Sequence, residues 1–304
     1  MRSIRISAFF ALVLLLSTVG CATNKDSWEK KSSNSFDEIQ YDRQGNLVWA
    51  VNFLDSKLHR LDLVTGAVEE ILLPPDVRIS DICFSNGLWL AGFNKRTGDN
   101  MIMKYSDIKL EDVFQSAVIL GCKVMKNGDI LFWDKSMIIS ISISSGGTIQ
   151  EIQGVKENVI TDVFRTDDGK MWMLTTDGKV YTNDGSGSWT LFAESPLYKH
   201  LFVDRSYLWV AGNQGIYRYQ TSLQRNEENL LEAPLGFYQD IFKTQNGWVW
   251  VVTSESIWAW KDNSFNVINL PSGTTLLKGY SLDYRNNIVF ISTNQGIYSL
   301  KLDE

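Results

Sequence analysis

The amino-acid sequence predicts an all-β fold, a seven-bladed β-propeller built from four-stranded antiparallel blades. The first observation is a repeat of about 40 residues that runs through most of the chain. The second is the alternation of apolar and polar residues in short runs rich in Val, Ile, Trp and Tyr, which end at Gly, Asn, Asp or Ser. The third is that no run has the spacing of an amphipathic helix. Many short, evenly spaced strands with one aromatic-glycine motif per repeat are typical of propellers.

Residues 168–181 are the clearest repeat unit. The turn pair Asp168-Gly169 precedes a short run centred on Trp172, and a second pair, Asp177-Gly178, precedes a run centred on Tyr181. Turn pairs between alternating runs predict a β-hairpin. The same arrangement recurs later, where residues 213–217 and 294–298 share the sequence Asn-Gln-Gly-Ile-Tyr.

An aromatic residue marks the centre of the predicted hairpin in each of seven repeats. We place these repeats at 36–74, 75–115, 116–154, 155–193, 194–234, 235–271 and 272–304. The markers are, in order, Trp49, Trp89, Phe132 or Trp133, Trp172, Trp209, Trp250 and Phe290.

The last repeat contains only three predicted strands, near residues 276–282, 288–292 and 296–302. An open blade would expose an unpaired strand edge, so a strand from elsewhere is needed to complete it. Residues 26–33 contain Trp28 in a sequence similar to 188–192, near the end of the fourth repeat. We therefore expect an N-terminal strand at about 26–33 to complete blade 7. The alternative is a disordered tether.

The first twenty residues form a separate unit. Arg2 and Arg5 precede an apolar run at 8–16, and small residues at 17–20 lead to Cys21. The apolar run is too short to span a membrane and predicts a secretory signal. Small residues before a cysteine resemble a bacterial lipobox, which implies that Cys21 is lipidated. The alternative is ordinary cleavage near Gly20.

The lipoprotein resemblance also implies an address. Ala22 after the cysteine resembles lipoproteins sent to the outer membrane, so we expect a lipid-anchored protein of the bacterial envelope that faces the periplasm. The expected organisation is a signal peptide at 1–20, a short tether at 21–25 and one propeller domain at 26–304.

Charge limits the classes of partner. The 304 residues carry a formal charge of −6, with a pI near 5.1 and no clustered Lys/Arg tract. A basic surface is required to bind nucleic acid or to adhere directly to anionic lipid. We therefore expect no nucleic acid partner, and contact with the membrane through the lipid anchor only.

The repeat wording resembles a known family. The sequences Asp-Gly-Lys-Met-Trp (168–172), Asn-Gly-Trp-Val-Trp (246–250) and Asn-Gln-Gly-Ile-Tyr are similar to propeller repeats in the periplasmic sensor regions of two-component regulators. The resemblance covers repeats 4 to 7 well and repeats 1 to 3 loosely. The sensor function does not carry over, because those sensors continue into membrane spans and kinase modules. Propeller lipoproteins of the outer-membrane assembly machinery are similar in general plan only.

Cysteine and histidine are sparse in the predicted propeller. Cys83 and Cys122 fall in neighbouring repeats but out of register with each other, so we expect two buried thiols; an exported protein could also bridge them. The histidines are His59, expected at the surface, and His200. No His-rich metal site, phosphate loop or nucleophile motif is present in the sequence.

One set of positions stands out at the start of the predicted inner strands. Residues at these positions would share one mouth of the channel. Oxygen ligands that converge on one axis suit a hard cation such as Ca²⁺ or a basic side chain; we expect no other cofactor. The alternative is that each acid caps local backbone N–H groups or is solvated. The set is Glu38, Asp81, Gly121, Asp162, His200, Asp240 and Gly279.

Four tryptophans crowd the sixth repeat. Alternation places Trp248 with Trp250 on one face, and Trp258 with Trp260 on another. Trp248, Trp258 and Trp260 are candidates for an aromatic platform that binds sugar or protein. The alternative is packing between neighbouring blades.

These patterns favour a non-enzymatic, membrane-anchored propeller that acts as a scaffold for a protein or an envelope polymer. The alternative function is a hydrolase or lyase that uses a metal at the acidic mouth. Lyases of similar shape use histidine near the channel together with acids, and here only His200 is available.

Overall fold

The structure is a computed structural model. It describes residues 28–301, except for 107–108, 117–118, 157, 186, 197, 205, 213–214, 223–228, 232–237, 245–246, 262–263 and 284–287. The predicted signal peptide (1–20), Cys21 and the predicted tether (21–25) lie outside the described residues. No helix in the described part of the chain is long and apolar enough to cross a membrane.

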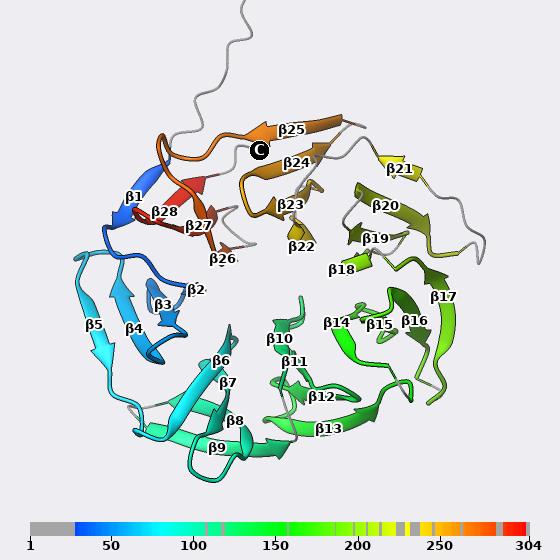
Figure 1. Ribbon diagram of the computed structural model, residues 1–304, viewed down its shortest axis with the longest axis horizontal. Coiled ribbons are helices and arrows are strands. Elements are labelled where there is room, and N and C mark those ends of the chain that lie inside the picture. The colour runs from blue at the N-terminus through cyan, green and yellow to red at the C-terminus, as the bar shows by residue number, and fades with distance from the viewer. Residues whose placement is uncertain are drawn as a thin grey trace, which may run out of the picture.

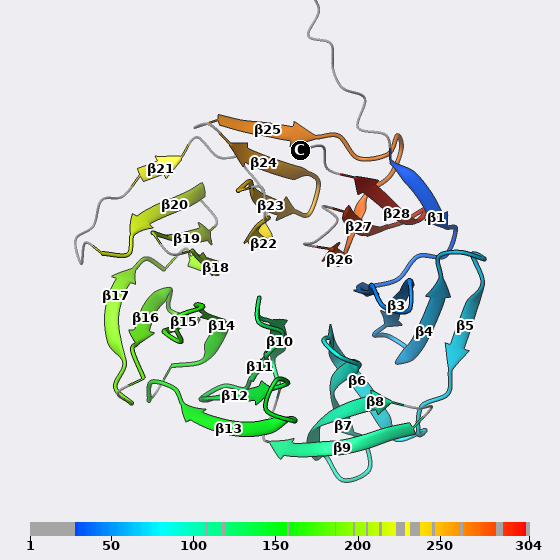
Figure 2. The same ribbon diagram turned by 180° about the vertical axis from the view of Figure 1, so that it is seen from behind.

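Seven four-stranded antiparallel sheets surround a central axis (Figures 1 and 2), which confirms the predicted propeller. The strands of each blade are given from the inner to the outer one. Blade 1 contains β2 (Glu38–Asp42), β3 (Leu47–Asn52), β4 (Lys57–Asp62) and β5 (Val68–Ile71), and blade 2 contains β6 (Val77–Phe84), β7 (Leu88–Asn94), β8 (Asn100–Ser106) and β9 (Lys109–Ser116). Blade 3 contains β10 (Gly121–Val124), β11 (Ile130–Trp133), β12 (Met137–Ser142) and β13 (Thr148–Gln153), and blade 4 contains β14 (Ile160–Arg165), β15 (Met171–Thr175), β16 (Lys179–Asn183) and β17 (Thr190–Glu194).

Blades 5 to 7 follow the same plan. Blade 5 contains β18 (Tyr198–Val203), β19 (Tyr207–Gly212), β20 (Gly215–Gln220) and β21 (Asn229–Leu231). Blade 6 contains β22 (Tyr238–Lys243), β23 (Val249–Thr253), β24 (Ile257–Lys261) and β25 (Ser264–Ile268). Blade 7 contains β26 (Leu276–Asp283), β27 (Ile288–Thr293), β28 (Gly296–Lys301) and β1 (Glu29–Ser32).

The second strand of each blade carries the aromatic marker predicted from the sequence. Blades pack face to face, so this strand is covered on both sides and tolerates continuous apolar runs such as Met-Trp-Met-Leu at 171–174 in β15, all of whose residues are buried. Trp172, Trp209 and Trp250 are at most 2% exposed. The hydrophobic core therefore lies between blades, and the inner strands around the channel keep more polar residues.

Turn glycines set how closely the outer strands pass the hairpins. Gly178 has a φ of +78°, and its N–H donates to the carbonyl of Thr175 at 2.8 Å. A Cβ atom at this position would lie 1.7 Å from the carbonyl oxygen of Ser195, just after the blade's outer strand. Only glycine allows both the backbone conformation and this approach.

The N-terminal strand completes blade 7, as the sequence predicts: β1 covers Glu29–Ser32 of the expected 26–33, of which residues 26–27 lie outside the described residues. It pairs antiparallel with β28 through Glu29 with Ser299 and Lys30 with Tyr298. Trp28 precedes the strand, and its indole Nε1 donates to the carbonyl of Asn269 at 2.7 Å. The ring is closed by a strand distant in sequence from its partners, and this strand covers the edge of β28 that a three-stranded blade would leave unpaired.

Candidate functional site at the channel mouth

The channel mouth is defined here by Glu38, Asp81, Asp162, His200 and Asp240, which lie in the inner strands of five blades. In four of these blades the pairing with the second strand shifts just before the mouth residue, which indicates a β-bulge. A bulge redirects the side chain that follows it. Asp162, His200 and Asp240 each follow such a bulge, and their ligand atoms lie within 4.8 Å of one another.

Asp162 holds three blades together. One carboxylate oxygen, Oδ1, accepts the N–H of Val163 at 2.8 Å and the ammonium of Lys123 at 2.7 Å. The other, Oδ2, accepts the N–H of Leu201 at 3.0 Å. Since Lys123 belongs to blade 3 and Leu201 to blade 5, this buried carboxylate of blade 4 bonds to both neighbouring blades. Charge-assisted bonds of this kind are stronger than neutral ones.

Lys123 is the residue at this site that the sequence did not reveal. Burial opposes its charge, but the carboxylates of Asp162 and Asp240 outweigh that effect and raise the pKa of the Lys123 ammonium. The side chain therefore remains protonated and supplies a positive charge among the mouth acids. A signal existed in the sequence, because Lys123 lies two residues after Gly121, the glycine at the mouth position of blade 3.

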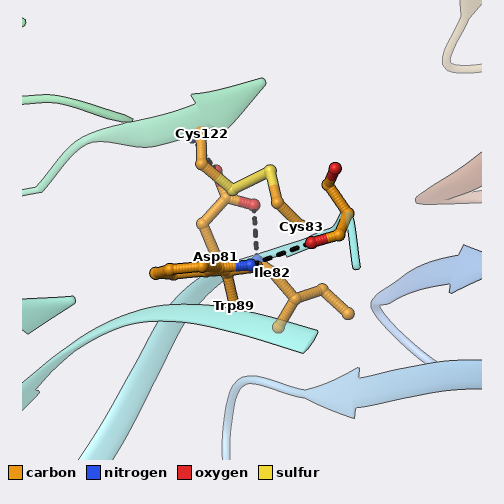
Figure 3. The surroundings of a disulfide bond; sticks show 6 residues. Asp81, Ile82, Cys83, Trp89 and Cys122 are labelled. Carbon is orange, nitrogen blue, oxygen red and sulfur yellow. Dashed lines mark hydrogen bonds between the residues drawn. A yellow bond between two sulfur atoms is a disulfide. The ribbon is translucent and has the colours of Figure 1, made fainter. Parts of the chain in front are cut away.

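Asp81 makes the same type of contact between blades 2 and 3. Its Oδ1 accepts the N–H of Ile82 at 2.9 Å, and its Oδ2 accepts the N–H of Cys122 at 2.8 Å (Figure 3). Asp81 and Asp162 therefore bond both their own strand and the next blade. In both residues the carboxylate accepts hydrogen bonds from backbone N–H groups. This is the capping role that the sequence allows as the alternative to binding a cation or a basic side chain.

Cys83 and Cys122 form a disulfide beside Asp81, so the expectation of two thiols was wrong (Figure 3). Their Cα atoms are 6.3 Å apart, within the range that a disulfide spans. The expectation assumed that two bridged cysteines must occupy the same position in their two repeats. Neighbouring blades present opposite faces to each other, and alternate residues of a strand point to opposite faces. Cys83 lies two residues after its mouth position and Cys122 one residue after, and this odd offset lets them meet.

Asp240 differs from Asp81 and Asp162. Its Oδ1 accepts the N–H of Ile241 at 2.7 Å, but no bond to blade 7 equivalent to the other two is found among the described residues. Burial raises the pKa of the Asp240 carboxyl; Asp162 adds to this effect, while Lys123 and His200 oppose it. Asp240 thus has more free bonding capacity than the other two aspartates, and it lies beside His200.

Glu38 takes the mouth position in blade 1. It pairs with Val51 in regular register, with no bulge before it, and it is half-buried. Its carboxylate is not part of the group formed by Asp162, His200 and Asp240. Gly121 takes the same position in blade 3, where a Cβ atom would lie 2.4 Å from the ring of Trp133. Gly279 occupies it in blade 7, within β26.

The blade-6 tryptophans pack between blades. Trp248 and Trp250 belong to the cluster between blades 6 and 7, and Trp258 and Trp260 to the cluster between blades 5 and 6. Trp260 packs edge-on against Trp209 at 4.9 Å between ring centroids. The two-face arrangement predicted from alternation is present, and each face meets a neighbouring blade.

His59 is half-buried, which differs from the surface position expected for it. Its ring packs against Phe36 at 5.0 Å, and burial lowers the pKa of the imidazole, while Glu70 opposes this effect. His59 belongs to β4, in the outer half of blade 1, so it does not join the channel mouth.

The mouth can act chemically in two ways. Asp162, His200 and Asp240 offer one imidazole and two carboxylates, a donor set that suits a divalent metal ion. The oxygens of Asp162 are already bonded, however, and Lys123 brings a fixed positive charge to the same carboxylate. The alternative is a polar pocket in which Asp240 and His200 bind a group carried by a ligand.

No protein-family model matches this chain. No curated protein matches it either. Solved structures do match over most of its length. A streptogramin B lyase is 19% identical with a TM-score of 0.67, covering 91% of this chain and 98% of that one. YCF48 bound to D1 peptide is 17% identical with a TM-score of 0.66, covering 91% and 97%.

A third match is the extracellular domain of the putative hybrid two-component system BT4673 from B. thetaiotaomicron. It is 12% identical with a TM-score of 0.68, and the match covers 92% of this chain and 40% of that one. At such identities the likeness concerns the fold. The neighbours include a lyase, the extracellular domain of a putative two-component system and a peptide-bound protein, so proteins of similar fold have several roles.

Proposed function

We propose that this chain is a lipid-anchored protein of the bacterial envelope whose propeller binds a protein or another envelope component without catalysing a reaction. Cys21 carries the lipid, and the propeller faces the periplasm from the outer membrane. The run of small residues before Cys21 and the apolar segment before it support the anchor.

One observation supports a binding role over a catalytic one: two of the mouth acids already hold neighbouring blades together. Asp81 and Asp162 each bond the backbone of the next blade, and Lys123 pairs with Asp162. An acid held in this way is poorly placed to exchange protons with a substrate. Asp240 and His200 remain to bind a ligand, and they suit a basic side chain or an amine of the partner. The solved structure of YCF48, which has a similar fold, is bound to D1 peptide, and this supports a peptide or protein as the partner.

The second candidate is a metal-assisted hydrolase or lyase. The observation that favours it is the convergence of Asp162, His200 and Asp240, together with the fold shared with streptogramin B lyase. In that case the metal would polarise a bond of the substrate, and His200 would be a ligand or a general base. Asp162 would have to release Lys123 to act as a metal ligand.

Two measurements test the first proposal. For the anchor, Cys21→Ser should move the protein from the membrane to the soluble fraction, and the wild-type N-terminal peptide should carry an acyl mass. A membrane-bound variant and an unmodified wild-type cysteine would contradict the lipoprotein assignment.

For the binding role, a photo-cross-linking amino acid at His200 should give a discrete adduct in cells. The same group at Thr190, on the exposed outer strand of blade 4, should not. The His200 adduct should be lost when Asp240 is also replaced by Asn while the protein remains folded. Equal adducts at His200 and Thr190 would contradict a ligand at the mouth.

A further inference from the structure

The position where the chain enters the propeller limits how an anchored molecule can face its membrane. Trp28 is the first described residue, and it lies on the rim between blades 6 and 7. Its indole N–H bonds to the carbonyl of Asn269, just after β25, and the next residues form β1. Both views show β1 and β25 next to each other on the rim (Figures 1 and 2). The chain is therefore fixed to the rim from Trp28 onward.

The segment between Cys21 and Trp28 is short. Six residues, 22–27, separate Cys21 from Trp28, and even when fully extended they span roughly 24 Å between those two residues. A compact body of this size has a radius of gyration of about 19 Å, which corresponds to a diameter of roughly 50 Å. A lipid at Cys21 would hold the rim at Trp28 near the bilayer and could not reach around to the opposite rim.

Charge on the outer strands favours the same orientation. The outer strands of blades 1 to 4 all carry exposed acids: Glu69, Glu70, Glu111, Asp112, Glu151 and Glu194. By contrast, β25 has the sequence Ser-Phe-Asn-Val-Ile with no charge, and β1 contributes two lysines and one glutamate. A lipid surface that contains anionic headgroups repels the acidic rim of blades 1 to 4 but not the rim of β25 and β1.

We infer that the propeller stands on its edge, with the rim formed by β25 and β1 against the lipid surface and the rim of blades 2 to 4 pointing away. The inference rests on the lipid anchor proposed at Cys21. It assigns this rim as the membrane-facing surface, and it leaves both ends of the channel open to the side. A partner can then reach Asp240 and His200 without displacing lipid.

The test attaches the protein chemically, so that it does not depend on acylation by the cell. The mature chain, residues 21–304 with the Cys83–Cys122 disulfide intact, is coupled through the Cys21 thiol to maleimide lipid in vesicles of phosphatidylcholine and phosphatidylglycerol. A fluorophore is placed through an azide-bearing amino acid at Asn266 in β25. The matched control places it at Gln150 in β13; both positions are exposed on outer strands. A short-range quencher on the lipid headgroups reports proximity to the bilayer.

Quenching at Asn266 is expected to be several-fold stronger than at Gln150. Inserting a long Gly/Ser segment between Cys21 and Trp28 should reduce the difference between the two positions, because the tether no longer restricts the molecule and only the charge of the rims still favours one orientation. Equal quenching with the native tether, as a propeller lying flat would give, overturns the inference. So does stronger quenching at Gln150, or a difference that the insertion leaves undiminished. The acyl mass of the native protein separately tests the anchor, so the two failures are distinguishable.

Discussion

Trp28 and Trp189 make the same hydrogen bond in two different blades. Trp28 donates its indole N–H to the carbonyl of Asn269 at 2.7 Å, and Trp189 donates to the carbonyl of Gln153 at 2.7 Å. Each tryptophan immediately precedes the outer strand of its own blade, and each acceptor lies at or just after the end of the outer strand of the preceding blade. The N-terminal segment thus takes the place of an ordinary outer strand, although it comes from the other end of the chain.

This relationship predicts that Trp28 contributes to closure of the ring. Trp28→Ala removes a half-buried indole and its hydrogen bond, and should lower the free energy of unfolding by about 2 kcal/mol. Trp28→Phe keeps the ring contact and should cost only about 1 kcal/mol. Denaturant titration of the mature chain measures both. Trp189→Ala is the matched control in a blade that closes without the N-terminus.

If Trp28→Ala left stability unchanged while Trp189→Ala lowered it, the closing strand would not support the fold. The segment would then be only a linker, whatever its position.

Much of the fold can be predicted from the sequence because the same pattern of strands and turns occurs in seven repeats. Trp172, Trp209 and Trp250 mark equivalent buried positions, and the sequence similarity of 27–29 to 188–190 locates the closing strand. Errors in one repeat are corrected by the others. Within the described residues β1 begins at Glu29 and ends at Ser32, one residue before the expected end, and a bulge between Lys30 and Ser32 that the repeat does not indicate interrupts its pairing.

The contacts between blades were harder to predict, because each joins two different repeat positions. Lys123 lies two residues after its mouth position, and it meets Asp162, which occupies the mouth position of the next blade. Cys83 and Cys122 likewise occupy unlike positions. A comparison of equivalent positions in the seven repeats can find the acids of the channel mouth. It cannot find their partners, which come from different positions in the neighbouring blade.

The disulfide predicts redox-dependent stability. Joining Cys83 and Cys122 closes a segment with a sequence separation of 39, and the chain-entropy model gives about 4 kcal/mol for a loop of that length. The double variant Cys83→Ser, Cys122→Ser should therefore unfold at a lower denaturant concentration. Alkylation followed by mass spectrometry should show no free thiol at either position in the oxidised wild type.

Strain or residual structure in the unfolded chain can reduce this gain, so the sign is the decisive result. A wild type that alkylates at both positions under oxidising conditions, or that loses no stability on reduction, would contradict a structural disulfide.

Asp240 and Asp162 should respond to substitution in opposite directions. Burial raises the pKa of the Asp240 carboxyl above the ordinary aspartate value of 3.8, so the folded state binds its proton more tightly than the unfolded state. Ionisation of Asp240 consequently costs stability as the pH rises from about 3.8 through the raised value, and this cost remains at neutral pH. Asp240→Asn should raise the free energy of unfolding at pH 7, and its advantage should vanish below pH 3.8.

Asp162→Asn should instead lower stability by about 3 kcal/mol, because it leaves Lys123 without its ionic partner in a largely buried position. Urea unfolding of both variants between pH 3 and 8 measures the contrast. If both variants were destabilised equally at every pH, Asp240 would be serving the structure as Asp162 does, and it would not be available to a ligand.

Lys123 decides whether the mouth accepts a metal ion. Its ammonium lies 2.7 Å from Asp162, so an added divalent ion must compete with a cation already attached to the chain. Lys123→Met removes that charge and leaves Asp162, His200 and Asp240 with their ligand atoms within 4.8 Å of one another. Repulsion between the two carboxylates should make this variant less stable in the absence of metal. Adding Zn²⁺ should restore its melting temperature, because an imidazole with two carboxylates suits that ion.

The wild type should show little response to Zn²⁺ or Ca²⁺, and Lys123→Arg, which keeps the positive charge, serves as the matched control. Binding linkage makes the measurement sensitive, since a ligand at a hundred times its dissociation constant adds about 2.7 kcal/mol to stability. A wild type that gains several degrees with either ion would show that Lys123 yields its place, and would favour the metal-assisted enzyme. A Lys123→Met variant that ignores Zn²⁺ would leave Asp240 and His200 as groups for an organic ligand alone.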